Sequence, residues 1–152
     1  MKGAQGCSVA GTTGNNIADA VALAKTADVV ILALGIDDGQ EREGLDRTIT
    51  TFPGQQTDLL SQIIALNNPN TVLVSFSGGA MSIGDGAKLP AVVSAIYGGE
   101  AGSTALADVL FGRYNPSGKL AATMYPADYV STNQTNQPTT NTMRDVGGWV
   151  GG

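Results

Sequence analysis

Histidine is absent from this 152-residue chain, and cysteine occurs only once. The lack of histidine excludes the Ser-His-Asp and Cys-His catalytic mechanisms and most zinc sites. With Cys7 as the single cysteine, no internal disulfide can form, and we expect a small buried apolar residue there. We therefore expect no metal and no cofactor, so any chemistry has to rest on other side chains.

Positive charge and long apolar runs are also scarce. Eight Lys and Arg against thirteen Asp and Glu give a net charge of −5, which disfavours nucleic acid as a partner. The longest apolar run, residues 29–34, is far shorter than the roughly 20 residues of a membrane-spanning helix. We therefore expect no membrane partner. Because residues 1–6 lack the apolar stretch of a signal peptide, nothing in the sequence itself indicates a localisation.

The apolar residues that are present alternate between helical and strand patterns. We predict helices over residues 17–26, 55–66 and 100–111, buried strands over residues 29–34, 71–76 and 91–97, and an edge strand over residues 120–124. The last helix is expected to bury Ala105, Leu106, Val109 and Leu110. This order predicts an α/β fold: a three-layer αβα sandwich with a mostly parallel, doubly wound sheet.

The strands are unbroken apolar runs, which predicts a sheet that is covered on both faces. Residues 1–130 would form this domain, and residues 131–152, rich in Gly, Thr and Asn, a flexible polar tail. After the second strand, the small residues 77–80 are either a plain turn, which we favour, or a place where the backbone approaches a sugar.

Residues 35–47 form the most charged segment of the chain. They contain five of the thirteen acidic residues and two arginines, directly after the strongest predicted strand. Ligands of such sheets bind at the carboxyl ends of the strands, so this loop is expected at the ligand-binding edge. The residues alone allow two interpretations: a solvated, self-paired surface loop, or a carboxylate held as a general acid/base by neighbouring charges.

Seven short strings support a resemblance to a known family. They are EREGLDR at 41–47, FPGQQ at 52–56, SGG at 77–79, YGGEAG at 97–102, ADVLFG at 107–112, NPSGKL at 115–120 and YPADY at 125–129. In this order and spacing they make the chain similar to the C-terminal α/β sandwich domain of glycoside hydrolase family 3, in its β-xylosidase and β-glucosidase members. The family's opening strand and helix are not recognisable here.

The resemblance implies which residues carry the chemistry. It assigns the general acid/base of a β-glycosidase to Glu41, with Glu43 as the rival candidate, and a loop-orienting role to Asp46 and Arg47. The family's nucleophile is an aspartate on a separate (β/α)8 barrel, which this chain lacks. The expected role is thus the acid/base-bearing domain of an enzyme that hydrolyses terminal β-xylosyl or β-glucosyl residues of plant-wall-type glycans.

The resemblance also implies partners. A barrel, in the same polypeptide or another, would complete the active site around a carbohydrate substrate, so we expect the isolated chain to be inactive and the enzyme to be secreted. The alternative is a non-catalytic glycan-binding or self-assembling structural subunit with the same fold. Without a barrel, an apolar docking face would be exposed, which favours a homo-oligomer.

Overall fold

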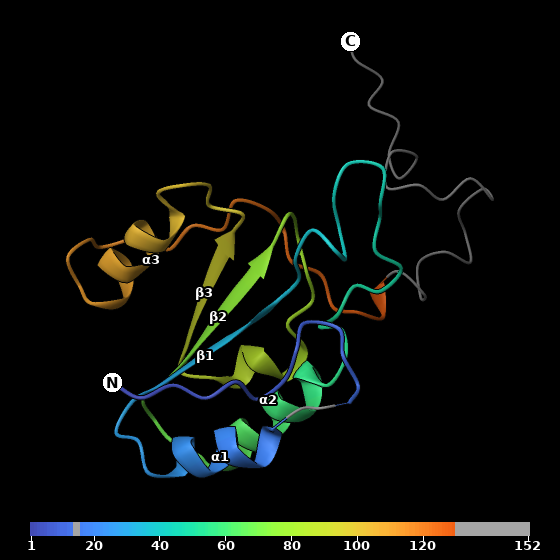
Figure 1. Cartoon of the computed structure of the whole chain (residues 1–152). Helices are drawn as coiled ribbons and strands as arrows, with labels where there is room; N and C mark the ends of the chain where they lie inside the picture. The colour runs from blue at the N-terminus through green and yellow to red at the C-terminus, as the bar shows by residue number, and fades with distance from the viewer. Residues whose placement is uncertain (14–15, 130–152) are drawn as a thin grey trace.

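The computed structural model describes residues 1–13 and 16–129 and contains a three-stranded parallel sheet. Its elements in chain order are α1 (Ile17–Lys25), β1 (Val30–Gly35), α2 (Gln56–Ala65), β2 (Thr71–Ser77), the 3-10 helix η1 (Gly84–Lys88), β3 (Ala91–Ile96) and α3 (Gly102–Leu110). The strand order is β1-β2-β3, with α1 and α2 on one side of the sheet and α3 beyond β3 (Figure 1). The predicted layered α/β architecture is confirmed, whereas the predicted tail lies outside the described residues.

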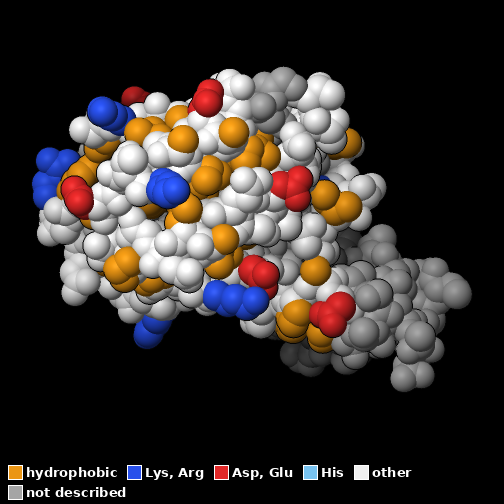
Figure 2. Space-filling model, turned by 90° about the horizontal axis from the view of Figure 1, so that it is seen from below, with side chains coloured by type: hydrophobic (Ala, Val, Ile, Leu, Met, Phe, Trp, Pro, Cys, Tyr) orange, Lys and Arg blue, Asp and Glu red, His pale blue; other side chains and the backbone are white. Residues whose placement is uncertain are grey.

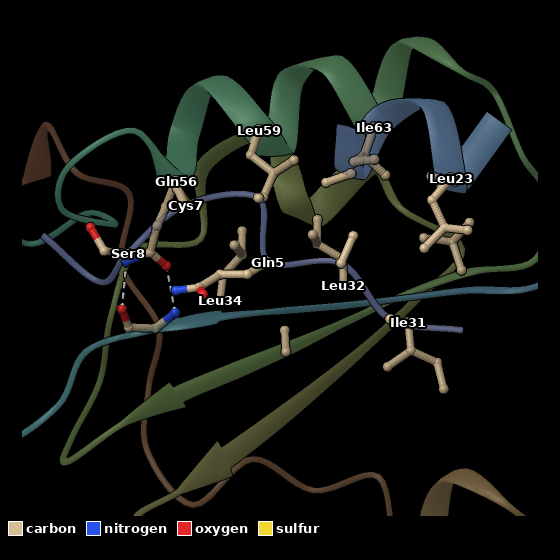
Figure 3. A pocket seen from close by; sticks show the side chains of 18 of the residues that line it. Gln5, Cys7, Ser8, Leu23, Ile31, Leu32, Leu34, Gln56, Leu59 and Ile63 are labelled. Carbon is tan, nitrogen blue, oxygen red and sulfur yellow. Dashed lines mark hydrogen bonds between the residues drawn. The ribbon is translucent and has the colours of Figure 1, made fainter. Parts of the chain in front are cut away.

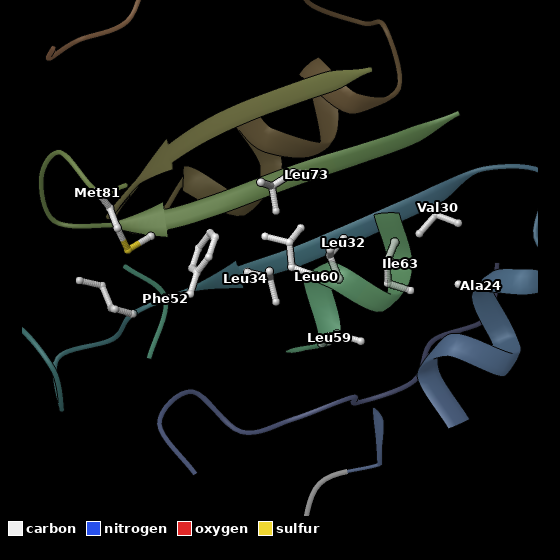
Figure 4. Close-up of a cluster of buried hydrophobic side chains, with 11 residues drawn as sticks. Ala24, Val30, Leu32, Leu34, Phe52, Leu59, Leu60, Ile63, Leu73 and Met81 are labelled. Atoms are coloured by element: carbon white, nitrogen blue, oxygen red, sulfur yellow. The ribbon is translucent and has the colours of Figure 1, made fainter. Parts of the chain in front are cut away.

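The core lies between the sheet and the layer of α1 and α2 (Figure 4). Alternate residues of β1 point into it, because successive strand side chains face opposite sides. In α2 the apolar residues recur at helical spacing and meet the strands. The buried cluster comprises Ala24, Val30, Leu32, Leu34, Ile36, Phe52, Leu59, Leu60, Ile63, Leu73 and Met81. Phe52 and Met81 extend it beneath the loops that follow the strands.

The prediction that both faces of every strand are covered is wrong for β1 and for β3, of whose residues none is buried and Val92 and Ile96 are exposed. Val29, just before β1, and Ile31 within β1 are 57% and 43% exposed, whereas Val30 and Leu32 are buried. In β2 the outward Val74 is only 1% exposed, whereas Val72 and Phe76 on the same face are half-buried, so the outer face of β2 is fully covered only at its centre. An apolar run indicates which residues can be buried, but it does not specify which neighbours cover them. Among the described elements, none covers the outer face of β1.

Two predictions for the last third of the described chain are also wrong. α3 buries none of its residues: Leu106, Val109 and Leu110 are half-buried, and Ala105 is exposed. Residues 120–124 form no strand. A strand needs backbone partners to satisfy its N–H and C=O groups, and within residues 1–13 and 16–129 this segment has no ladder partner.

The surface over α1 and α2 carries charges of both signs. Seen from below in Figure 2, Lys, Arg, Asp and Glu side chains stand singly between patches of apolar atoms. Charge is therefore dispersed on this face, in contrast to the acidic loop after β1.

Of the helices that the structure describes, none has the length and apolar character to cross a lipid bilayer.

Candidate active site

The loop after β1 leaves the carboxyl end of the sheet through an ordered turn (cyan in Figure 1). The Ile36 N–H still donates to the Phe76 C=O, at 2.9 Å, so the ladder continues one residue past β1. Asp37 then forms the turn: its carboxylate accepts from the Gly39 N–H at 3.0 Å, and its C=O accepts from the Glu41 N–H at 3.1 Å. Aspartate suits this place because its side chain hydrogen-bonds backbone two residues on. The turn fixes the backbone of Glu41 close to the sheet edge.

The next four residues form a tight hairpin. Arg42 and Leu45 exchange both backbone hydrogen bonds, at 3.0 and 2.9 Å, and Gly44 has the positive φ of 77° that the turn requires. Glu43 is therefore exposed at the tip of the hairpin, away from the sheet. Asp46 is also exposed, and within the described part of the chain no hydrogen bond or ion pair engages its carboxylate.

Glu41 and Arg47 are brought together by this hairpin. Arg47 Nε lies 2.9 Å from Glu41 Oε2, and the two side chains are 14% and 25% exposed, respectively. Arg47 Nη2 also donates to the C=O of Ala80, in the loop after β2. Arg47 Nη1 is buried and has no hydrogen-bond partner among the described residues. The arginine therefore links two loops and holds one oxygen of the glutamate, which leaves the carboxylate partly accessible.

Two residues from the neighbouring strand ends complete the surroundings of Glu41. Gly78 follows β2 and Tyr97 follows β3. Glu41 Oε1 lies 2.8 Å, and Tyr97 Cε2 3.2 Å, from the point where a Cβ on Gly78 would stand. Desolvation raises the pKa of the Tyr97 hydroxyl, and the negative charges of Glu41 and Asp37 raise it further, with Arg47 opposing them. The loops after all three strands thus converge on one carboxylate.

Gln56 at the start of α2 anchors the base of the loop, a role that the sequence analysis does not predict. Its Oε1 accepts from the Gly35 N–H at 2.7 Å, and its Nε2 donates to the C=O groups of Gly35 at 2.7 Å and Val9 at 2.6 Å. The side chain is 3% exposed. It lies between the start of α2 and the end of β1 (Figure 3). The sequence does contain an indication that Gln56 is buried. Leu59, Leu60 and Ile63 follow it at helical spacing, which places Gln56 on the face of α2 that points to the core.

A cavity of about 480 Å³ lies elsewhere, between residues 2–9, α1, β1 and α2 (Figure 3). Most of its lining is apolar, including Leu23, Leu32 and Leu59, and residues 37–47 contribute nothing to it. Burial raises the pKa of the half-buried Cys7 thiol, which lines this cavity. A raised pKa disfavours the nucleophilic thiolate. Because the lining of this cavity offers no carboxylate and no reactive thiolate, we take the carboxylate at the sheet edge as the candidate site.

The chemistry of the site is that of a single positioned carboxylate. Across residues 1–13 and 16–129, no group of three or more His, Cys, Asp or Glu side chains is arranged to hold a metal ion. A carboxylate that is held on one oxygen and partly accessible can give a proton to a ligand at the sheet edge or take one from it. The site therefore has the elements of general acid/base catalysis.

The chain is similar to proteins of one family over most of its length. A family model described as the glycosyl hydrolase family 3 C-terminal domain matches residues 4–148. Probable beta-D-xylosidase 7 of Arabidopsis thaliana is 36% identical over 150 residues, which are 97% of this chain and 19% of that protein. Beta-D-xylosidase 3 of the same plant is 43% identical over 128 residues, which are 82% of this chain and 16% of that protein.

Solved structures give the same result. A family 3 exo-β-xylosidase in complex with a xylobiose aziridine probe matches with a TM-score of 0.74 and 34% identity, over 88% of this chain and 17% of that one. A β-glucosidase from Kluyveromyces marxianus matches with a TM-score of 0.66 and 35% identity, over 72% of this chain and 13% of that one. The chain spans less than a fifth of the length of these relatives. It belongs to glycoside hydrolase family 3, and it corresponds to the C-terminal α/β domain of that family.

Proposed function

We propose that this chain supplies Glu41 as the general acid/base of a β-glycosidase that hydrolyses terminal β-xylosyl or β-glucosyl residues of plant-wall-type glycans. The observation that carries the proposal is the ion pair of Glu41 with Arg47 at the carboxyl edge of the sheet. A catalytic carboxylate has to be held in one orientation and still reach its substrate. Glu41 meets both conditions, since it is paired at 2.9 Å and 25% exposed.

The proposed reaction needs a second carboxylate from outside this chain. In a retaining glycosidase the nucleophile attacks the sugar while the acid/base protonates the departing glycosidic oxygen. The acid/base then takes a proton from the water that releases the sugar, and the two carboxyl groups lie about 5–5.5 Å apart. We assign the nucleophile to a (β/α)8 barrel in the same polypeptide or in a partner chain.

The other loop residues have supporting parts in this proposal. Arg47 holds Glu41 Oε2 and is itself fixed by the C=O of Ala80, so it orients the acid/base. We propose that Asp46 orients the outer part of the loop in the assembled enzyme. Glu43, exposed at the tip of the hairpin, remains the rival acid/base. The names of the similar xylosidases and glucosidases support the choice of sugar class.

A second candidate function is a self-assembling or glycan-binding subunit without catalysis. One observation favours self-assembly: Val29 and Ile31 expose apolar side chains at the edge of the sheet. An edge strand with apolar side chains invites pairing with another chain. In this case the Glu41–Arg47 pair would only stabilise the loop.

Nitrophenol release from aryl β-xyloside and β-glucoside tests the first proposal. The chain is assayed alone and after fusion to the barrel of a family 3 β-xylosidase, each time as wild type, Glu41→Gln and Glu43→Gln. We expect turnover only with the barrel, a loss of about 10²–10⁴-fold in Glu41→Gln, and little change in Glu43→Gln.

Azide distinguishes loss of acid/base catalysis from loss of structure. Azide attacks the glycosyl-enzyme intermediate without needing a general base, so it should restore turnover to Glu41→Gln and yield the glycosyl azide. A loss confined to Glu43→Gln would transfer the role to the rival residue. Unchanged turnover in both variants would contradict the proposal.

A further inference from the structure

We propose that Gly78 is a positioning residue for Glu41: its missing side chain reserves the space that the carboxylate occupies against Arg47. The inference rests on the proposed function for its catalytic meaning, whereas the geometry stands independently of it. A Cβ at position 78 would lie 2.8 Å from Glu41 Oε1, closer than real Cβ atoms approach an oxygen. Any side chain larger than hydrogen therefore competes with the carboxylate for the same volume.

The glutamate, rather than the loop backbone, has to give way. The loop after β2 is fixed by two hydrogen bonds: Ser77 Oγ donates to the Gly79 C=O at 2.7 Å, and Arg47 Nη2 donates to the Ala80 C=O. Glu41 Oε1, in contrast, is the free end of a flexible side chain. A methyl group at position 78 would push this oxygen away and disturb the 2.9 Å contact between Glu41 Oε2 and Arg47 Nε.

This arrangement differs from that of glycines that the fold itself needs. A Cβ on Gly35 would lie 2.2 Å from the Phe76 C=O oxygen, and a Cβ on Gly54 would lie 2.8 Å from the Ala10 carbonyl carbon. At both positions the obstacle is backbone, so a larger residue costs stability. At Gly78 both nearest atoms belong to side-chain ends, of Glu41 and of Tyr97, so the cost is expected in the position of the carboxylate.

Gly79 provides a matched control one residue away. A Cβ there would meet nothing within 4 Å. Neither Gly78 nor Gly79 is among the glycines with positive φ, so alanine can adopt the backbone conformation at both positions. The two substitutions therefore make the same chemical change in the same loop, and they differ only in what the new methyl group meets.

Tyr97 forms the second side of the reserved space. Its Cε2 atom lies 3.2 Å from the same point, a tight contact that a small rotation of the ring relieves. The side chain is 46% exposed and has room to turn toward solvent. We therefore expect the methyl group to displace Glu41 first and the ring only slightly.

The test uses the full chain and the side-chain N–H signal of Arg47 Nε. In a nitrogen–proton correlation spectrum, an Nε–H that donates to a carboxylate exchanges slowly with water and has a shifted proton resonance. Glu41→Gln, which removes the charge of the acceptor, sets the reference for a weakened pair. We expect Gly78→Ala to shift this signal or lose it, and Gly79→Ala to leave it as in wild type, with both unfolding midpoints within about 3 °C of wild type.

Three results would overturn the proposal: an unchanged Arg47 signal in Gly78→Ala, the same change in Gly79→Ala, or a large loss of stability in Gly78→Ala, which would make the glycine structural. In the barrel fusion, Gly78→Ala should lower kcat about tenfold to 100-fold, with KM changed little, because the acid/base is displaced. Failure of the proposed function gives a different result: Glu41→Gln in the barrel fusion would then keep full turnover. The Arg47 Nε–H signal would still decide whether Gly78 positions Glu41.

Discussion

The two oxygens of the Glu41 carboxylate have different surroundings. Oε2 accepts from the Arg47 guanidinium, whereas Oε1 faces the backbone of Gly78 and the ring of Tyr97. Arginine suits the first role because its planar group stays charged and makes several directed hydrogen bonds. Under the proposed function, Oε1 is thus the oxygen that exchanges a proton with the substrate.

Tyr97 reports on the charge of Glu41. Desolvation is the main cause of its raised pKa, and the negative charge of Glu41 is the next. We expect Glu41→Gln to lower the pKa of Tyr97 toward its ordinary value, and Glu43→Gln, at the exposed hairpin tip, to leave it unchanged. Ultraviolet absorbance of tyrosinate, with Tyr97→Phe subtracted, measures this pKa. An equal effect of both variants would mean that Glu41 has no special proximity to the ring.

The raised pKa of Tyr97 makes the free energy of unfolding depend on pH. Because the folded-state pKa of Tyr97 lies above the ordinary value of 10.0, the folded chain favours the neutral hydroxyl. Its contribution to the free energy of unfolding is present below about pH 10 and is lost as the pH rises through the folded-state pKa. The decline above about pH 10 should therefore be shallower in Tyr97→Phe than in wild type.

At the scale of elements, one side chain connects the end of β1 to the start of α2. Gln56 hydrogen-bonds both the N–H and the C=O of Gly35, as a neighbouring strand would do. The acidic loop begins just after Gly35, and the segment between β1 and α2 that contains it ends at Gln55, so this contact closes the base of that segment. The third hydrogen bond, to the Val9 C=O, joins the N-terminal segment to the same point.

Gln56→Ala should lower the free energy of unfolding by about 2–4 kcal/mol, because it leaves the buried backbone groups of Gly35 without partners. Gln62→Ala is the control, since Gln62 lies on the exposed side of the same helix. Urea unfolding monitored by circular dichroism measures both. Equal stability of the two variants would show that water replaces the lost hydrogen bonds.

At the scale of the whole molecule, the outer face at the β1 edge is open. Ile31 is 43% exposed and Val29 57%, while the opposite face of the strand carries the core. An apolar edge of this kind favours association. We expect the chain to self-associate reversibly in sedimentation velocity, and Ile31→Lys to shift it to monomer.

Ala18→Lys is the matched control, because it adds the same charge at an exposed position of α1. It should associate like wild type. If the wild-type chain sediments as a monomer at every concentration, the self-assembling alternative loses its support. The proposed acid/base role is not affected by that result.

Local patterns were sufficient to predict most elements. The helical spacing in α2 and the apolar runs of β1, β2 and β3 agree with the structure to within about a residue at most ends. The prediction of an edge strand at residues 120–124 was wrong because a strand depends on a partner that its own residues do not specify. The prediction that β1 and β3 are covered on both faces was wrong for the same reason, since burial depends on neighbours.

For the candidate site, the sequence by itself determined which segment carries the charge and at which end of the sheet it lies. The family resemblance assigns a loop-orienting role to Arg47, but only the tertiary structure decided that Arg47, and not the adjacent Arg42, forms the ion pair with Glu41. Only the tertiary structure brought Gly78 and Tyr97 to the same carboxylate. The physical reason is that side-chain periodicity does not specify how an irregular loop folds back on itself, as residues 41–47 do, and it does not specify contacts between strand ends that are far apart in the chain.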